Sequence, residues 1–505
     1  MKKTPSVNHG ATTANLIRLV AKGSFIVLVG SITGKVLRFI LHVILARVLG
    51  VASYGLYSLG QSINDISLYI VSLGDGKAIV RFGSVYSSRG DVQRLKGLIF
   101  GFLFISLGLS IILVICFFTF SGFIAHGIFK NPALEQVLKI FSMGLPFSII
   151  LITTAAIGFA FNKARYKVII QDIGQTSVNT LLIIGIFFLK GGLKGAIFGY
   201  IASLLISSLF GIFLVIKNFP LLVARTPVVF EIRKIIGYSL PIVFIVSSYF
   251  LIFEIDRILL GFFLSVKEVG IYTIASSIAM NILVFSSIFV ANFSPVITQL
   301  YHNNKIMQLK KMYKLVSLWG VWLTFIPCIC FIIFYREIIS LFGSGFESAK
   351  PVLIILSVVF LLESIAIQTR ELLQMSGKQN IEVINSIFSI VLNILLNVAL
   401  IPIFGIVGAS IATGFSLLSV SFIRIIEIKN IFGFLAFTPR FIRFLILAAC
   451  IIIVCIAWLI NQGLPVRLLG SVVIISCFVF FYYLFKAKED VLVWNAFKRR
   501  LLSVS

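Results

Sequence analysis

The sequence is poor in charged residues, and acidic residues are the scarcer kind. Only 12% of its 505 residues are charged and 59% are apolar, whereas about 25% of an ordinary soluble domain is charged. Apolar runs of 20 or more residues recur from residue 24 to residue 485, which leaves no stretch for a separate soluble domain. The composition therefore excludes a water-soluble globule and predicts a polytopic membrane protein.

Histidine and cysteine are also scarce, which narrows the chemistry that the chain can perform. The six cysteines all fall inside apolar runs without the paired spacing of a zinc site, and the four histidines are scattered. No Gly-Lys dipeptide has the neighbouring glycine and hydroxyl residue of a phosphate-binding loop. We therefore expect no bound cofactor, no metal centre and no direct use of ATP.

The apolar runs predict fourteen transmembrane spans, and hence an all-α fold. A window of about 20 residues places these spans at 24–49, 53–75, 97–120, 137–160, 168–189, 194–216, 235–263, 269–298, 315–335, 350–374, 382–402, 405–427, 441–461 and 466–486.

The basic residues give these spans a direction. With the amino terminus in the cytoplasm, 31 of the 43 Lys and Arg residues fall on the cytoplasmic side and only 9 on the outer side. The positive-inside rule therefore predicts a multi-pass protein of the cytoplasmic (inner) membrane with both termini in the cytoplasm. The net charge of +26 is then explained by topology and by contact with anionic lipids, and no nucleic-acid partner is expected.

An internal repeat divides the chain. Residues 49–63 align without gaps on residues 264–278 at an offset of 215, and residues 192–196 align on residues 405–409 at an offset of 213. Each half contains an even number of spans, so the repeat is parallel, with its axis along the membrane normal. Two such bundles enclose a central cavity at mid-membrane, which is the layout of an alternating-access transporter.

The repeat also sets the expected domains. Asn179 aligns with Asn393 at an offset of 214, between the two other matches. We expect a first six-helix bundle over 1–220, a second over 221–435, and two further helices with a cytoplasmic tail over 436–505.

Charged side chains in the first span are the first candidates for a binding site. Lys35, Arg38 and His42 fall on one helical stripe, with Lys35 and Arg38 near the bilayer centre. Two cations within one turn repel each other unless an anion lies between them. That anion is either a phosphate of a transported substrate or a carboxylate of another helix, with Asp65 of the second span as the candidate.

The seventh span, the repeat partner of the first, carries Glu254, Asp256 and Arg257. Glu254 and Arg257 share a face at i, i+3 and form either a local ion pair or part of a gate or ion-coupling site. Glu363 is a lone carboxylate in the middle of the tenth span and is a further candidate. Other polar side chains at membrane depth are expected to form interhelical hydrogen bonds, among them Asp172, Gln175, Asn179, Asn393 and Asn397.

The segment after the first span resembles a known signature. Residues 46–57, ARVLGVASYGLY, are similar to the signature of Wzx-type polysaccharide-biosynthesis flippases, within the multidrug/oligosaccharidyl-lipid/polysaccharide exporter superfamily. Asp256-Arg257 followed by residues 269–272, VGIY, is similar to the second-half pattern of that family, as is the segment 73–82. The resemblance covers about residues 12–430.

The resemblance implies a fold and a function. The fold would be two six-helix bundles in a V shape, and the function would be to move an undecaprenyl-pyrophosphate-linked oligosaccharide from the inner to the outer leaflet for cell-surface polysaccharide export. The basic residues expected to grip the pyrophosphate, between spans 1, 2, 7 and 8, are Lys35, Arg38, His42 and Arg257. The candidates for ion coupling or gating, with H⁺ or Na⁺ as the ion, are Asp65, Glu254, Asp256 and Glu363.

Two other functions stay open on the residues alone. The carboxylates make the expected cavity mixed in charge, which also suits a multidrug or cation antiporter of the same fold. A membrane glycan polymerase or ligase is an alternative of another class, but the expected outer loops are short for holding an acceptor. The expected partners are the lipid-linked glycan and membrane lipids, with the polysaccharide polymerase machinery as a further candidate.

Overall fold

The computed structural model of the chain describes residues 13–73, 76–161, 163, 165–222, 226–286, 297–298, 300–301, 303–435 and 437–484. Over these residues the regular structure is helical and contains no strand. Ten of the described helical segments are long and apolar enough to cross a membrane. The predicted all-α polytopic fold is therefore confirmed.

The helices follow one another in two similar series. The first half contains α1 (Thr13–Val71), α2 (Lys77–Arg89), α3 (Val92–Gly122), η1 (Phe123–Ile128), α4 (Ala133–Ser142), α5 (Leu145–Ala160), α6 (Arg165–Lys167), η2 (Val168–Gln175), α7 (Thr176–Phe188), α8 (Gly192–Asn218) and η3 (Pro220–Leu222). The second half contains α9 (Ile232–Phe263), α10 (Val266–Met280), α12 (Ile306–Ile333), α13 (Tyr335–Ser340), η4 (Glu347–Ala349), α14 (Lys350–Met375) and α15 (Gln379–Phe432). The chain continues with α16 (Pro439–Ala457), η5 (Leu459–Asn461) and α17 (Leu464–Leu484).

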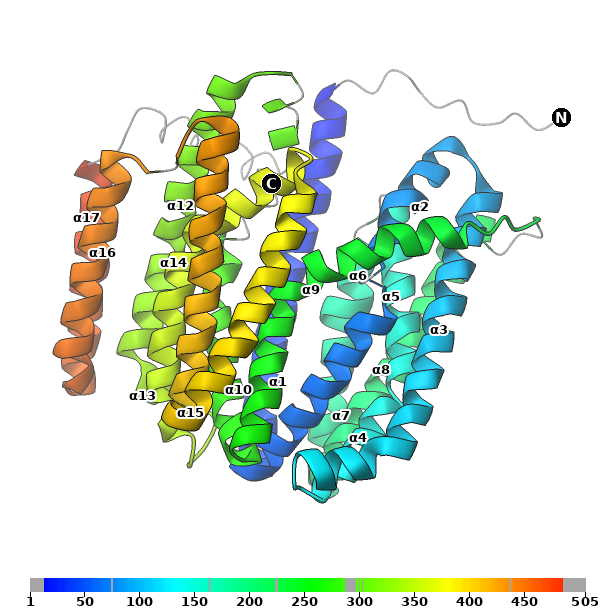
Figure 1. The fold of residues 1–505 in the computed structure, drawn as a ribbon, viewed down its shortest axis with the longest axis horizontal. Coiled ribbons are helices and arrows are strands. Elements are labelled where there is room, and N and C mark those ends of the chain that lie inside the picture. Colours follow the sequence, from blue (N-terminus) through cyan, green and yellow to red (C-terminus); the bar gives the residue numbers. More distant parts are fainter. Residues whose placement is uncertain are drawn as a thin grey trace.

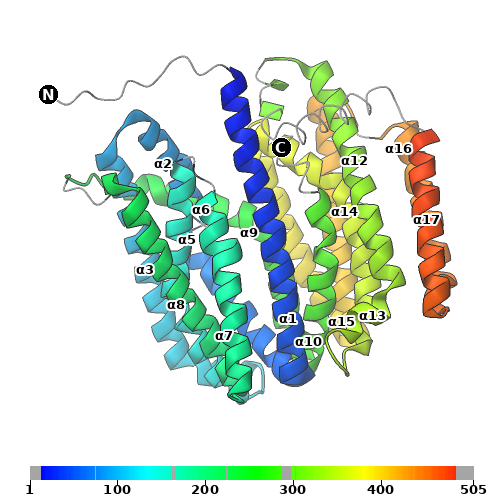
Figure 2. The same cartoon turned by 180° about the vertical axis from the view of Figure 1, so that it is seen from behind.

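The helices form two bundles arranged as a V. Helices α2 to α8 make up one bundle, and α10 to α15 make up the other, with α16 and α17 at its outer edge (Figure 1). The bundles meet at the end where α1 bends and α9 passes into α10, and they diverge at the opposite end (Figure 2). We call these the joined end and the splayed end. A kink at Gly50 divides α1 into two limbs, and the first limb, before Gly50, lies between the bundles (Figure 2).

Two long helices contain the boundary between two predicted spans. The sequence predicts separate spans at 24–49 and 53–75, and again at 382–402 and 405–427, and the backbone is indeed non-helical at both boundaries, so α1 and α15 each consist of two helices joined at a kink. Each helix turns back at a glycine with positive φ, 71° at Gly50 and 58° at Gly405. Gly192, the repeat partner of Gly405, has a φ of 56°. Glycine adopts this conformation without a steric penalty, so the two halves share one turn between their last two spans.

The bundles touch closely at the joined end, through two repeat-related glycines. A Cβ atom on Gly55 of α1 would lie 1.7 Å from the carbonyl oxygen of Val266, and one on Gly270 of α10 would lie 2.8 Å from that of Val51. Val51 and Val266 are themselves repeat partners, so the contact is nearly symmetric. Small residues let helix backbones approach this closely inside a membrane.

Helix α9 joins the two bundles. Its beginning is held on the first bundle. Tyr86 donates a hydrogen bond to Glu231, just before the helix, and the guanidinium of Arg81 lies 4.6 Å from the ring centroid of Tyr238, within the helix. The remainder of α9 crosses to the second bundle and packs against α15 and α10 (Figure 1). The helix that carries Glu254 and Arg257 therefore spans the space between the bundles.

The accessory helices α16 and α17 pack against α12 through aromatic side chains. Phe478 stacks on Phe325 with ring centroids 4.3 Å apart, and Trp322 stacks on Phe444 at 5.0 Å. Arg467, at the start of α17, is buried and pairs with Glu337.

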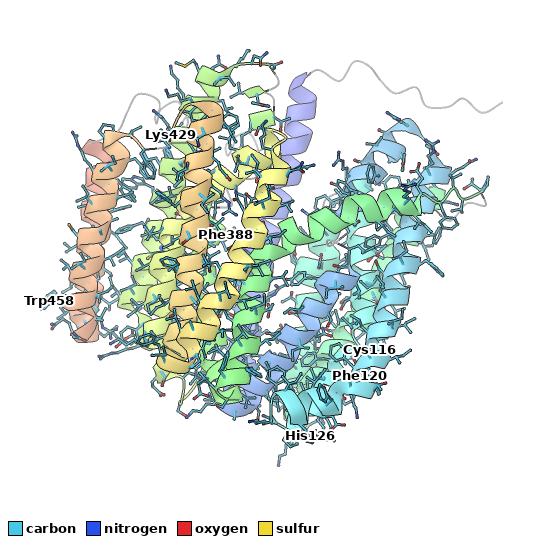
Figure 3. All side chains as sticks on the ribbon, in the orientation of Figure 1. Cys116, Phe120, His126, Phe388, Lys429 and Trp458 are labelled. Carbon is cyan, nitrogen blue, oxygen red and sulfur yellow. The ribbon has the colours of Figure 1, made fainter. Side chains whose placement is uncertain are left out.

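Large apolar side chains cover the outer surface. Phe120, Phe388 and Trp458 project away from the bundles and are exposed (Figure 3). Exposed apolar surface of this extent indicates contact with lipid.

Candidate functional site

The predicted basic stripe lies on the first limb of α1. Lys35 and Arg38 are exposed, whereas His42 is half-buried and its Nδ1 lies 3.0 Å from the hydroxyl of Tyr54. Tyr54 is fully buried on the second limb of the same helix. The hydrogen bond therefore ties the two limbs of α1 together next to the joined end. Sequence reasoning did not single out Tyr54, although it belongs to the quoted motif of residues 46–57.

Lys35 has a carboxylate partner that the sequence did not predict. It interacts electrostatically with Asp172 of η2, and a Cβ on Gly34 would lie 2.6 Å from the carbonyl oxygen of Asp172. The prediction that Asp65 neutralises both cations of the stripe is therefore incomplete, because close packing at Gly34 brings Asp172 to Lys35. The signal for it was the polar face of the fifth span, where Asp172 precedes Gln175 by one turn.

Five of the predicted residues come together between the bundles. Arg257 donates a hydrogen bond from Nη1 to Glu254 Oε2 at 2.8 Å, so the local pair exists. Asp65 interacts electrostatically with Glu254, Arg257 and Arg38, and His42 with Arg38 and Arg257. We call Arg38, His42, Asp65, Glu254 and Arg257 the central charge cluster. Because α1 and α9 both cross between the bundles, the two helices can present these groups to one ligand.

The charges in and beside the cluster balance. Three basic side chains face three carboxylates, namely Lys35, Arg38 and Arg257 against Asp65, Asp172 and Glu254. The repulsion between neighbouring cations is therefore offset within the protein. An anionic ligand that binds here competes with the chain's own carboxylates for these basic side chains.

One nitrogen of the cluster is left without a partner. The Nε of Arg257 is buried and makes no hydrogen bond to any residue that the structure describes. A buried N–H group without an acceptor costs about 1–3 kcal/mol, and more when it is charged. Such a donor is suited to an acceptor that arrives with a ligand.

Asp256 lies apart from the cluster, in a cage of four donors. Its Oδ1 accepts hydrogen bonds from Asn397 Nδ2 at 2.7 Å and Asn393 Nδ2 at 3.1 Å. Its Oδ2 accepts from the hydroxyls of Tyr272 and Thr413, both at 2.5 Å. All five residues are buried, so this carboxylate is removed from solvent but fully hydrogen-bonded. We call these residues the Asp256 cage.

The cage contains two further oxygens without partners. The Oδ1 atoms of Asn393 and Asn397 are buried and accept no hydrogen bond within the described part of the chain. Rotation of each amide by 180° exchanges its nitrogen for its oxygen. The same side chains can therefore surround either a bare carboxylate or a cation held beside it.

Glu363 does not join the other candidates. It is buried on α14, accepts a hydrogen bond from Ser421, and lies 3.8 Å from Nη1 of Arg424 on α15. Arg424 also pairs with Glu382 at 2.6 Å. Glu363 has no cation near it in the sequence, but it is paired in the fold, because α15 returns past α14 and brings Arg424 to it.

Comparison with known proteins identifies two family models in the chain. A model of the polysaccharide biosynthesis protein family matches residues 20–301, which is more than half of the chain, and the MatE model matches residues 241–399. The resemblance predicted from the motifs is therefore confirmed.

Two curated relatives have been named as flippases. The chain is 28% identical over 287 residues to the probable low-salt glycan biosynthesis flippase Agl15 of Haloferax volcanii, covering 55% of this chain and 58% of that protein. It is 34% identical over 164 residues to the probable flippase AglR of the same organism, covering 32% of this chain and 34% of that protein. The chain thus spans less than two thirds of the length of either relative.

Solved structures share the fold. The lipid II flippase MurJ, in an inward closed conformation, superposes with a TM-score of 0.71 over 90% of this chain and 98% of that chain. The sequence identity is 16%, so this likeness concerns the fold.

Proposed function

This chain belongs to the polysaccharide biosynthesis protein family, and from that premise we propose that it is a flippase for a lipid-linked glycan. Its substrate is an undecaprenyl-pyrophosphate-linked oligosaccharide, moved from the inner to the outer leaflet of the cytoplasmic membrane for cell-surface polysaccharide export. Two relatives with flippase names and the fold shared with MurJ support this proposal. The glycolipid crosses unchanged, so the chain is a transporter and not an enzyme.

The observation that carries the proposal is the meeting of Arg38 and Arg257 in one charge cluster between the two bundles. Guanidinium groups bind phosphate oxygens through paired N–H donors. The pyrophosphate binds at this cluster, next to Lys35. The sugar occupies the space between the bundles, and the lipid tail stays in the bilayer.

Transport follows from a change in which end of the V is open. With the amino terminus in the cytoplasm, the splayed end faces the cytoplasm and the joined end faces outward. The head group enters from the splayed end and reaches the cluster while the Gly55 and Gly270 contact keeps the outer side closed. Rocking of the bundles then separates this contact and exposes the head group to the outer leaflet.

The Asp256 cage is the place for a coupling ion in this scheme, and we assign Na⁺ to it. Hard cations prefer oxygen ligands from carboxylate, amide and hydroxyl groups. Asp256, Thr413 and the two unpartnered amide oxygens of Asn393 and Asn397 offer such a set. The cage connects α9, α10 and α15, so a cation there biases how α9 packs against the second bundle. Transport that is unchanged after collapse of both Na⁺ and H⁺ gradients would refute ion coupling.

The first experiment compares two ligands on the purified full-length protein in lipid nanodiscs. The wild type is expected to bind undecaprenyl-pyrophosphate-linked glycan, and the Lys35→Ala/Arg38→Ala variant is expected to bind it about tenfold more weakly or worse. Lys305→Ala/Lys310→Ala is the matched control, because it removes two cations at the start of α12, away from the cluster. Equal binding by all three proteins contradicts the proposed site.

A cation antiporter of the same fold is the second candidate function. The MatE match over residues 241–399 and the carboxylates Asp65 and Glu254 favour it. Binding of a cationic dye such as rhodamine 6G, unaffected by Lys35→Ala/Arg38→Ala and lost in Asp65→Asn, together with no glycolipid binding, would replace the flippase proposal with this one.

A further inference from the structure

Arg257 and Glu254 form an ion pair that uses only part of the arginine. The two side chains are 13% and 10% exposed, and the pair is closed by the single hydrogen bond from Nη1 to Glu254 Oε2. Nε, on another edge of the same guanidinium, is buried and has no acceptor among the residues described above. A guanidinium presents its five N–H groups in a rigid planar fork, so holding Nη1 also fixes where Nε points.

The unused edge fits an oxyanion. Its geometry suits two oxygens of a phosphate or a carboxylate, with Nε as one of the two donors. The unpartnered nitrogen is costly while the site is empty, and this cost is recovered when an acceptor binds. Arg257 is therefore held ready for an anion on one edge while Glu254 occupies another.

Glu254 also changes the strength with which that anion is held. In a low-dielectric environment, an uncompensated guanidinium attracts an anion strongly. A transporter has to release its ligand on the other side, so binding that is too tight slows the cycle, as it does in channels. Glu254 neutralises much of the charge of Arg257 at 2.8 Å, and Asp65 lies close enough to interact with both.

We propose that Glu254 is a positioning residue and a resident counter-charge for Arg257. It holds the guanidinium so that Nε faces the anionic head group, and it keeps the affinity for that head group low enough for release. This inference rests on the proposed function and adds to it the residue that balances affinity against turnover.

The test uses the full-length protein in lipid nanodiscs with two probes, undecaprenyl pyrophosphate and the uncharged undecaprenol. In Glu254→Gln the amide oxygen still accepts from Nη1 but the charge is gone. We expect this variant to bind undecaprenyl pyrophosphate about tenfold more tightly than the wild type. Flipping of the fluorescent pyrophosphate lipid in proteoliposomes should become slower at saturation, and undecaprenol binding should not change.

Glu254→Ala separates positioning from charge. It removes both the charge and the acceptor for Nη1, so its affinity is expected to fall below that of Glu254→Gln. Glu135→Gln is the matched control, because Glu135 pairs with Lys139 on the same helix at 2.6 Å, outside the cluster. Its binding and flipping should equal those of the wild type. If Glu254→Gln does not fold, Glu254→Asp, whose shorter carboxylate neutralises Arg257 less well, should bind about threefold more tightly.

The outcomes distinguish this inference from the proposed function. A wild type that binds undecaprenyl pyrophosphate no better than undecaprenol overturns the proposed function. A wild type that prefers the pyrophosphate, with a Glu254→Gln variant of equal or weaker affinity, overturns only the role of Glu254. Tighter binding with slower flipping in Glu254→Gln supports both.

Discussion

The two halves of the chain share one fold but differ at three of the five positions that form the Asp256 cage. The repeat offsets of 213 to 215 pair Asp256 with Leu41, Tyr272 with Tyr57, and the other cage residues with first-half positions in the same order. Asn393, Asn397 and Thr413 correspond to Asn179, Ile183 and Tyr200. Leu41, Tyr57 and Ile183 belong to one buried apolar core, against which Tyr200 packs.

The comparison shows that the fold does not need the cage. The first bundle has the same fold, although leucine and isoleucine stand at the positions where the second bundle has a carboxylate and an amide. Burying a carboxylate is expensive even when it is hydrogen-bonded. The asymmetry therefore favours a functional rather than a purely structural role for Asp256, in line with the cation site proposed above.

At the joined end the halves are alike instead. Gly55 and Gly270 are repeat partners and pack on the carbonyls of Val266 and Val51. Each half contributes the same element to this contact, as a near-twofold arrangement requires. Symmetry is thus kept where the bundles touch, and it is lost at the Asp256 cage.

The largest effect is expected when the second half is given the residue of the first. Asp256→Leu leaves four donors without their acceptor, each at about 1–3 kcal/mol. We expect no folded protein, or a thermal midpoint in detergent far below that of the wild type. The milder Asp256→Asn should fold and lose any stabilisation by NaCl over KCl, whereas Asp91→Asn, at the exposed N-cap of α3, should keep it. Wild-type stability of Asp256→Leu would contradict the importance of the cage.

The reverse exchange should have the next largest effect. Leu41→Asp buries a carboxylate with only part of a donor set around it, and we expect a loss of about 2–4 kcal/mol in the free energy of unfolding. Adding Ile183→Asn supplies the amide that corresponds to Asn397 and should restore part of this loss. Thermal denaturation of the single and double variants measures the coupling. Additive effects of the two changes would argue against an equivalent site in the first half.

Substitution of the two glycines tests the symmetric contact. Gly55→Ala places a methyl group 1.7 Å from a carbonyl oxygen, and Gly270→Ala places one at 2.8 Å. Both substitutions should push α1 and α10 apart and lower the free energy of unfolding by about 1–3 kcal/mol. The larger effect is expected for Gly55. The rate at which a cysteine introduced at Val51 reacts with a maleimide reports this opening. Gly185→Ala, which meets nothing within 4 Å, is the control and should not change the rate.

The smallest effect concerns the accessory helices, which have no counterpart after the first half. Burial raises the pKa of Glu337, but hydrogen bonds and the charge of Arg467 lower it by more, so this pKa lies below its usual range. A carboxylate whose pKa is depressed on folding stabilises above its unfolded pKa, and the contribution is lost as the pH falls through the folded value.

Glu337→Gln should therefore lower the thermal midpoint at neutral pH, by the equivalent of about 1 kcal/mol. The difference from the wild type should shrink as the pH falls from neutral through the lowered pKa of the folded state, because Glu337 then becomes protonated. A difference that stays constant over this pH range would show that the pair acts through packing rather than through charge.

Much of the architecture was predictable because its signals are local. Apolar runs specify the spans, the repeat specifies two similar bundles, and i, i+3 spacing alone predicts the pair of Glu254 and Arg257. The separate spans predicted on either side of Gly50 correspond to the two helices of α1 that meet at the kink there. The motif of residues 46–57 indicated the family.

The partners of the buried charges could not be read from the sequence in the same way. Asp172 reaches Lys35 because η2 packs against Gly34, and Arg424 reaches Glu363 because α15 returns past α14. Neither partner lies within a few turns of its charge along the chain. Sequence periodicity predicts which face of a helix is polar, but it does not predict which other helix packs against that face.

The sequence by itself thus determined the class of protein, the spans, the repeat and the family, because hydrophobic length, helical period and motif are properties of neighbouring residues. Only the tertiary structure decided that Asp256 receives donors from α10 and from both limbs of α15, and that Nε of Arg257 has no acceptor in the described ranges. The physical reason is that burial and hydrogen bonding in a bundle depend on how helices pack against one another, and that packing joins residues more than a hundred positions apart.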